Sequence, residues 1–193
     1  MSNLLTPFKK EKQTGSTPTD IAVILRRYFP ERALAGILGN IDVETGGTFD
    51  FQQQQKGGNG YGLFQFDFQK EAYHKWLEDT KEDDSAESQI RFVAESIYND
   101  KSVPTGLFKT EEGPTARHTQ ISREGDEKDR VQVYTGPLDL GGEARAALRN
   151  SFETGTHKEI AKTFSEYFER PSKPHLKLRE DSAFNLGGLL SKL

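Results

Sequence analysis

Glu44 is the residue of this 193-residue chain whose type and position best fit acid–base chemistry. It follows Ile41 by three residues and Ile37 by seven, so in a helix it lies on their apolar face. It also falls in the last helical turn, where the helix dipole disfavours a carboxylate. Both effects favour a protonated carboxyl, the form needed for general-acid cleavage of a glycosidic bond. On the spacing alone, the favoured alternative is structural: a half-buried glutamate paired with an arginine, or one that reaches solvent as the helix ends.

A strip of glycines, aromatic residues and an amide follows Glu44, with the sequence Gly60-Tyr61-Gly62-Leu63-Phe64-Gln65-Phe66. Glycines let the backbone bend closely, while aromatic and amide side chains suit sugar faces and acetamido groups. Such a strip could line a saccharide cleft, with Tyr61 and Gln65 as the better candidates and Phe66 as a further one. The alternative is a hairpin whose apolar side chains, Phe66 among them, cover the core.

The composition excludes several classes of protein. A net charge of -4 without a long basic run argues against a nucleic-acid binder. The absence of cysteine excludes thiol catalysis, disulfides and cysteine-ligated zinc. We expect no membrane insertion and no signal peptide, because the apolar runs are too short. We also expect no metal and no cofactor, since the histidines lack ligand spacing: His74, His118, His157 and His175.

Apolar periodicity predicts a mainly helical chain with a small β component. Thr19-Asp20 is the expected N-cap of the first helix, and Gly46-Gly47 is expected to end the second. Residues 48–66 are expected to form a short irregular hairpin or loop, and segments 117–121 and 131–133 permit a second hairpin. The expected helices cover residues 21–29, 31–44, 68–77, 86–98, 143–152, 156–168 and 173–184.

The segment from Ala35 to Gly47, followed by Phe49-Asp50 and the strip 60–66, resembles the bacteriophage tail-associated lysozyme family. That family is part of a lysozyme-like group with goose-type lysozymes and lytic transglycosylases. The segments 89–97 and 164–171 are similar to later helices of the same domain. The resemblance covers roughly residues 20–184, with 99–142 unmatched.

The resemblance implies a lysozyme-like fold, α+β and mainly α, with a small β-hairpin beside the active-site cleft. It implies that Glu44 is the catalytic acid and that bacterial peptidoglycan is the substrate, cut between N-acetylmuramic acid and N-acetylglucosamine. Tyr61, Gln65, Phe66 and Tyr167 are then expected to bind the saccharide. Thr45 departs mildly from the serine that is usual after the acid.

A second acid is harder to assign. An inverting hydrolase needs a carboxylate that activates water, roughly 6.5 to 9.5 Å from the acid. Asp50 and Asp67 are the candidates, and we favour Asp50, although Asp50 could cap a turn and Asp67 the next helix. If neither serves, Glu44 alone could support lytic transglycosylation. An inactive lysozyme-like protein of the phage tail and a carbohydrate-binding module also remain open.

The domain boundaries follow from the same patterns. Residues 1–17 are expected to form a flexible arm that docks on phage tail or baseplate proteins, before a domain over 18–184 and a tail over 185–193. We expect a protein of the virion, or of the host cytoplasm before delivery to the cell wall. Four cations near the C-terminus are interpreted as ordinary surface charges: Arg170, Lys173, Lys177 and Arg179.

Overall fold

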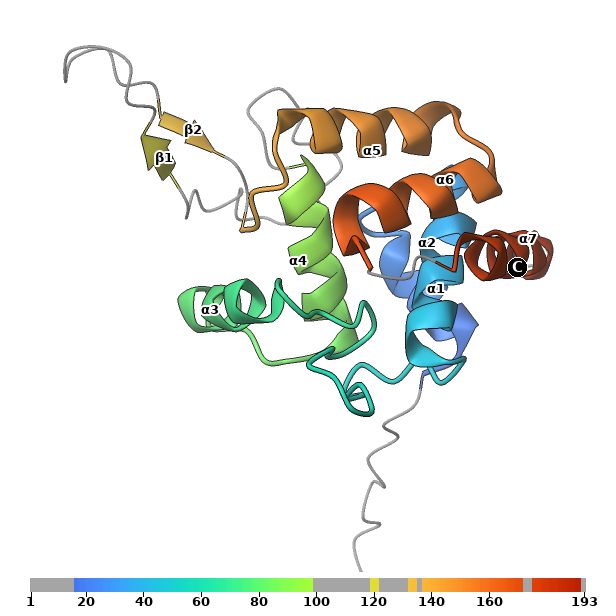
Figure 1. Ribbon diagram of the computed structural model, residues 1–193, viewed down its shortest axis with the longest axis horizontal. Helices are drawn as coiled ribbons and strands as arrows, with labels where there is room; N and C mark the ends of the chain where they lie inside the picture. Colours follow the sequence, from blue (N-terminus) through green and yellow to red (C-terminus); the bar gives the residue numbers. More distant parts are fainter. Residues whose placement is uncertain (1–15, 99–118, 122–131, 135–136, 172–174, 192–193) are drawn as a thin grey trace, which may run out of the picture.

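The protein is described by a computed structural model that covers residues 16–98, 119–121, 132–134, 137–171 and 175–191. The described part is mainly helical (Figure 1). A two-stranded antiparallel sheet pairs β1 (Thr119–Ile121) with β2 (Gln132–Tyr134), at the two segments where the sequence permits a second hairpin. The helices are α1 (Pro18–Leu25), α2 (Glu31–Thr45), α3 (Lys70–Thr80), α4 (Ala86–Tyr98), α5 (Gly142–Thr154), α6 (His157–Phe164), the π-helical turn η2 (Ser165–Glu169) and α7 (Leu176–Leu190).

Local capping interactions fix several helix ends. Thr17 begins α1 through a capping box in which its hydroxyl and the Asp20 carboxylate satisfy each other's backbone N–H groups. The cap is therefore Thr17, not the predicted Thr19-Asp20, because Pro18 is already helical. Gly46 ends α2 in the left-handed conformation, with φ at 60°, as predicted.

α2 lies at the centre of the helical body and packs against α6 and α7 (Figure 1). Two glycines on α2 allow this close approach. A Cβ atom at Gly36 would lie 2.7 Å from Cβ of Ile160 on α6, and one at Gly39 would lie 2.7 Å from the backbone nitrogen of Ala183 on α7. The sequence therefore lets three helices meet around the buried stripe of α2.

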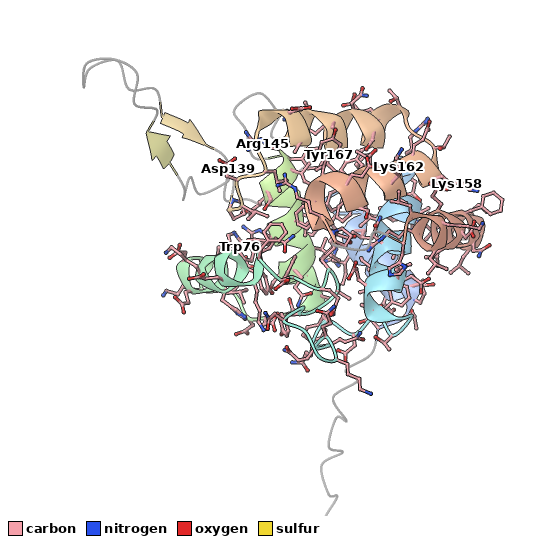
Figure 2. The ribbon with its side chains drawn as sticks, in the orientation of Figure 1. Trp76, Asp139, Arg145, Lys158, Lys162 and Tyr167 are labelled. Atoms are coloured by element: carbon pink, nitrogen blue, oxygen red, sulfur yellow. The ribbon has the colours of Figure 1, made fainter. Side chains whose placement is uncertain are left out.

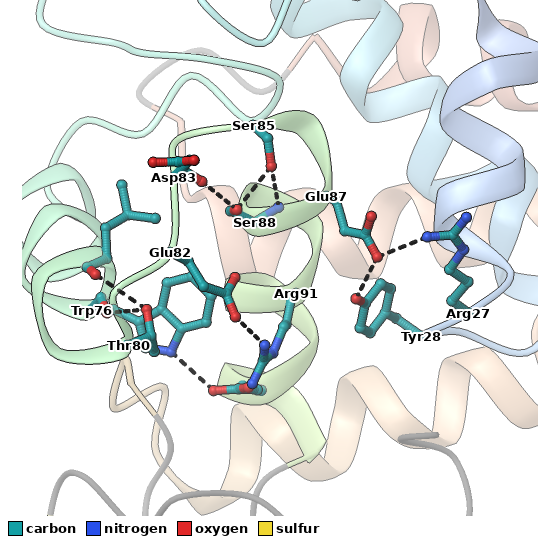
Figure 3. Close-up of polar contacts among 12 residues, drawn as sticks. Arg27, Tyr28, Trp76, Thr80, Glu82, Asp83, Ser85, Glu87, Ser88 and Arg91 are labelled. Carbon is teal, nitrogen blue, oxygen red and sulfur yellow. Dashed lines mark hydrogen bonds and ion pairs between the residues drawn. The ribbon is translucent and has the colours of Figure 1, made fainter. Parts of the chain in front are cut away.

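Aromatic packing and polar contacts join α3 and α4 to this body. The buried ring of Phe66 lies 5.5 Å from that of Phe92 on α4 and 5.1 Å from that of Tyr73 on α3. Glu87 of α4 accepts hydrogen bonds from Arg27 at 2.8 Å and Tyr28 at 3.0 Å, just beyond α1 (Figure 3). These contacts place the loop between α2 and α3 over a continuous core.

Two sequence expectations need correction. Residues 185–190 are not a tail, because α7 continues to Leu190, which is buried. The segment between Thr45 and Lys70 is the loop of the two predicted alternatives, with one antiparallel bridge, Gln54 to Tyr61; the β-hairpin that the resemblance implies beside the cleft is not found among the described residues. Its six glycines favour turns over a regular ladder.

Other expectations fall partly outside the described residues. The arm over residues 1–17 does so up to residue 15, and the insertion over 99–142 is described only in short pieces. Among the helices that the structure describes, none combines the length and the apolar character that a membrane span requires.

Candidate functional site

Glu44 lies in the last turn of α2, directly before the loop that contains the glycine-rich strip. Its side chain is 17% exposed, so it is partly accessible to solvent at the end of the helix. The next residue, Thr45, is buried; its hydroxyl donates to the Ile41 carbonyl at 2.7 Å and accepts from the Phe49 backbone at 3.2 Å. The helix end and the start of the loop are therefore held together beside Glu44.

A buried arginine holds the Glu44 carboxyl group. Arg179 on α7 is 1% exposed; its Nη2 atom forms an ion pair with Oε1 of Glu44 and its Nη1 atom forms one with Oε2 of Glu169. Nη1 also donates to Oδ1 of Asn40 at 2.8 Å. The interpretation of Arg179 as a surface charge is therefore wrong, because the packing of α7 on α2 buries it.

Glu169 is the second acid of this cluster. Its side chain is 3% exposed, and its Oε1 atom has no hydrogen-bond partner among the described residues. Burial raises the pKa of Glu169, the Glu44 charge adds to this rise, and the Arg179 guanidinium opposes it. One guanidinium thus faces two carboxyl groups, one at the surface and one inside.

Sequence reasoning missed both members of this cluster. The signal for Arg179 was present, because it shares a helical stripe with Ala183, Leu186 and Leu190 at spacings of four, seven and eleven residues. Glu169 carried no such signal: it lies in a π-helical turn, where the helical period used to assign faces changes.

Polar side chains of α4 and the turn before it anchor the strip 60–66. Gln89 accepts a hydrogen bond from the Leu63 backbone at 2.8 Å and donates to the Phe51 carbonyl at 2.7 Å. Asp84 accepts hydrogen bonds from the hydroxyls of Tyr61 and Tyr73. Burial and the Asp84 carboxylate raise the pKa of Tyr61, which keeps its hydroxyl a donor.

Of the three strip residues that are predicted to contact a saccharide, one is fully buried and two keep a small exposed surface. Phe66 has no exposed surface, and this burial gives it a place in the core instead of on a saccharide surface. Tyr61 and Gln65 are 8% and 9% exposed, and Nε2 of Gln65 donates to the Gly62 carbonyl at 2.7 Å. Contact of Tyr61 and Gln65 with a saccharide stays a prediction.

The two candidate second acids flank this strip in the sequence. Asp50 is half-buried, and its Oδ1 atom accepts from the Gln52 backbone at 2.9 Å, so it does cap a turn. Asp67 is exposed, but it does not cap α3, whose N-cap is Gln69. The assignment of Asp50 as a base stays a prediction. In the described part of the chain, no group of three or more acidic or histidine side chains is placed to hold a metal ion.

Three surface pockets lie away from Glu44. One of about 670 Å³ lies along α3 and is lined by residues that include Asp67 and His74. Another, of about 510 Å³, lies between α5 and the α6–η2 segment and is lined in part by Tyr167. Figure 2 shows Tyr167 on the side of the molecule that faces α5. The structure therefore does not bring Tyr167 into the cluster of Glu44 and Arg179.

Comparison with known protein families gives a match over most of the chain. Residues 21–187, which include every described helix residue except the ends of α1 and α7, match the phage tail lysozyme family. A search among curated proteins finds no matching relative. A lysozyme family implies an enzyme that cleaves peptidoglycan, so peptidoglycan is the substrate that the match indicates. The chain belongs to the phage tail lysozyme family.

Proposed function

We propose that this protein is a muramidase that uses Glu44 as its general acid. The observation that supports this most directly is the position of Glu44: a partly exposed acidic side chain at the end of a buried helix, followed at once by an anchored loop. The substrate is the β-1,4 bond between N-acetylmuramic acid and N-acetylglucosamine, as the resemblance implies. Tyr61 and Gln65 are the loop residues proposed to contact the sugar.

In the proposed reaction, the Glu44 carboxyl group donates its proton to the bridging oxygen of the glycosidic bond. The bond between this oxygen and C1 of the muramic acid breaks, and the oxygen keeps the electron pair. Water adds to C1 and gives up one proton, for which Asp50 is the proposed acceptor. The products are two free hydroxyl groups, one of them at the reducing end of the muramic acid.

Lytic transglycosylation is the alternative reaction. There the 6-hydroxyl of the muramic acid attacks C1 in place of water and closes a 1,6-anhydro ring. The hydrogen bond from the Gln52 backbone to Asp50 favours this alternative, since it gives Asp50 a structural role. The two products differ by the mass of one water molecule, so mass spectrometry of digested glycan distinguishes the reactions.

We further propose that the protein acts as part of the phage particle. The arm over residues 1–17 would dock on tail or baseplate proteins, and delivery with the particle would bring the enzyme to the cell wall. Pull-down of assembled tails with the full chain and with a chain lacking residues 1–15 tests this assignment. Equal recovery by both chains would contradict it.

Glu44→Gln tests the catalytic assignment. The amide is nearly isosteric but cannot donate a carboxylic proton, so we expect wall-degrading activity to fall by at least about a hundredfold. The measurement is release of soluble fragments from purified peptidoglycan, with the melting temperature as a check of folding.

Glu31→Gln is the matched control, because Glu31 begins the same helix and is paired with Arg26 at the surface. This control should digest peptidoglycan at the wild-type rate. Near-normal digestion by Glu44→Gln would contradict the assignment. A wild-type protein that folds but digests nothing would identify an inactive lysozyme-like protein of the tail.

A further inference from the structure

The cluster of Glu44, Arg179 and Glu169 poses a question about how the proposed acid keeps its proton. A guanidinium beside a carboxyl group favours the ionised form, whereas a general acid must be protonated when the substrate binds. An arginine that was paired with Glu44 alone would therefore oppose the protonation that catalysis requires. Arg179 is not paired with Glu44 alone, since its Nη1 atom is paired with Glu169.

We propose that Glu169 and Arg179 are positioning residues for Glu44, in a cluster whose two acids hold one proton between them. This inference rests on the proposed role of Glu44 as the acid. With one proton shared by the two acids, the cluster has no net charge. Whichever acid holds the proton, the other remains a carboxylate paired with Arg179, so protonation of Glu44 does not leave a buried guanidinium unpaired.

The burial of the cluster is the first support for this proposal. Arg179 and Glu169 are 1% and 3% exposed, so an uncompensated charge on either would be costly. Oε1 of Glu169 has no partner among the described residues, so the pair of Oε2 with Arg179 compensates the charge of Glu169 when it is a carboxylate. Glu44, at 17% exposed, is the member that a substrate can reach.

The fixed geometry of Arg179 is the second support. Asn40 accepts from Arg179 at 2.8 Å, and its own amide donates to the carbonyls of Gly36 at 2.9 Å and Ala161 at 3.0 Å. These bonds tie the guanidinium to the buried face of α2 and to α6. The planar fork can then present separate nitrogens to the two acids, which a single ammonium group could not do.

The neighbouring charged groups are engaged elsewhere. Asp42 on α2 accepts from the Ser182 hydroxyl at 2.5 Å, and Asp181 on α7 is paired with Lys177 at 3.1 Å. Glu166 on η2 is paired with Lys162 of α6 at 3.8 Å. Arg170 donates to the carbonyls of Tyr167 and Leu140. Glu180 is the remaining ionisable group on the described part of α7, and it is half-buried.

Proton balance in the reaction is maintained as follows. The proton leaves Glu44 for the glycosidic oxygen, and the new Glu44 carboxylate is stabilised by Arg179. The nucleophile that adds to C1, a water molecule or the 6-hydroxyl, releases one proton. Return of one proton to the cluster restores its starting state, so no net proton is consumed.

Glu169→Gln tests the proposal through the pH dependence of peptidoglycan digestion. The variant removes the second carboxylate, so protonation of Glu44 would remove the remaining ion pair between Arg179 and the two acids of the cluster. The alkaline limb of the pH–activity profile should therefore move to lower pH, with its midpoint shifted down by about one pH unit or more. Arg179→Lys should lower kcat by about tenfold or more with a smaller change in KM, because the ammonium cannot hold both acids.

Glu95→Gln is the matched control. Glu95 on α4 is 11% exposed, pairs with Arg91 at 2.8 Å and accepts from the Trp76 indole at 3.0 Å (the Trp76 and Arg91 contacts are drawn in Figure 3). Its loss removes a comparable partly buried ion pair far from Glu44 along the chain. This control should lower the melting temperature but keep the wild-type pH profile.

The outcomes separate this inference from the proposed function. If Glu44→Gln is inactive while Glu169→Gln keeps the wild-type profile, the positioning role is wrong and the acid assignment stands. If Glu44→Gln remains active, both are wrong. If Arg179→Lys does not fold, the pH profile of Glu169→Gln alone tests the inference. If Glu169→Gln does not fold either, Glu169→Asp replaces it. This variant keeps the charge, so a midpoint that differs from that of the wild type would contradict the inference.

Discussion

Single polar side chains hold the loop that follows Glu44. Asp84 accepts from two tyrosine hydroxyls, one from the loop and one from α3, and the Tyr73 bond measures 2.7 Å. Gln89 joins two further points of the loop through its amide. Backbone hydrogen bonds such as the pair between Tyr61 and Phe66, at 3.1 and 2.9 Å, order the loop internally, and these side chains tie it to α3 and α4.

We expect Asp84→Asn to destabilise the protein. An amide presents one oxygen and an NH2 group, so one tyrosine hydroxyl would lose its acceptor, at a cost of about 1–3 kcal/mol in the free energy of unfolding. Chemical denaturation followed by circular dichroism measures this change. Asp83→Asn, at the exposed neighbouring position, should stay within about 0.5 kcal/mol of the wild type. Equal stability of the two variants would show that Asp84 does not anchor the loop.

Packing between helices decides whether Arg179 can reach Glu44. Gly39 lies against the backbone of Ala183 on α7, and this contact is one turn along α7 from Arg179. Backbone atoms cannot rotate out of the way as a flexible side chain can. A larger residue at position 39 must therefore move α7 away from α2.

We expect Gly39→Ala to lower both stability and activity. The added methyl group would lie 2.7 Å from the Ala183 nitrogen, and overpacking of this kind costs about 1–3 kcal/mol. The same displacement would loosen the pair of Arg179 and Glu44, so kcat should fall.

Gly142→Ala is the control, because a methyl group there meets no atom within 4 Å. It should leave activity unchanged and stability equal or higher by up to about 1 kcal/mol. A Gly39→Ala protein with wild-type kcat would contradict the link between helix packing and the site.

The buried acid Glu169 links the stability of the whole domain to pH. Burial raises its pKa above the ordinary value of 4.5, so the folded state holds this proton more tightly than the unfolded state. The resulting contribution to stability is present below the ordinary value. It is lost as the pH rises through the raised pKa of the folded state.

We expect the melting temperature of the wild type to fall relative to that of Glu169→Gln between about pH 5 and about pH 8.5. The variant cannot titrate at position 169, so the difference between the two proteins reports the titration of the cluster of Glu169, Glu44 and Arg179 and not that of the more distant charges. A change of at least about 2 °C in that difference should be measurable by differential scanning calorimetry. A difference that stays constant with pH would show that Glu169 does not change its protonation on folding.

Much of the fold could be predicted from the sequence, because helix formation depends on nearby residues. The apolar periods located the helices, and Gly46 marked the end of α2 as expected. The N-terminal end of α1 lies earlier in the chain than predicted, since Thr17 and Pro18 start the helix before the apolar period begins. The end of α7 was missed because the weaker stripe after residue 184 gains its stability from packing.

The sequence by itself determined the position of Glu44 on α2 and the family to which its motif belongs, since both depend on residues close together in the chain. Only the tertiary structure decided what surrounds that carboxyl group. Arg179 is 135 residues from Glu44 in the sequence, and the two meet because small residues let α7 pack on α2. That packing buried Arg179, and packing against α3 and α4 buried Phe66, although their residue types alone fit a solvated face and a ligand surface. Side chains brought together by helix packing share no local period, so their pairing follows from the folded structure alone.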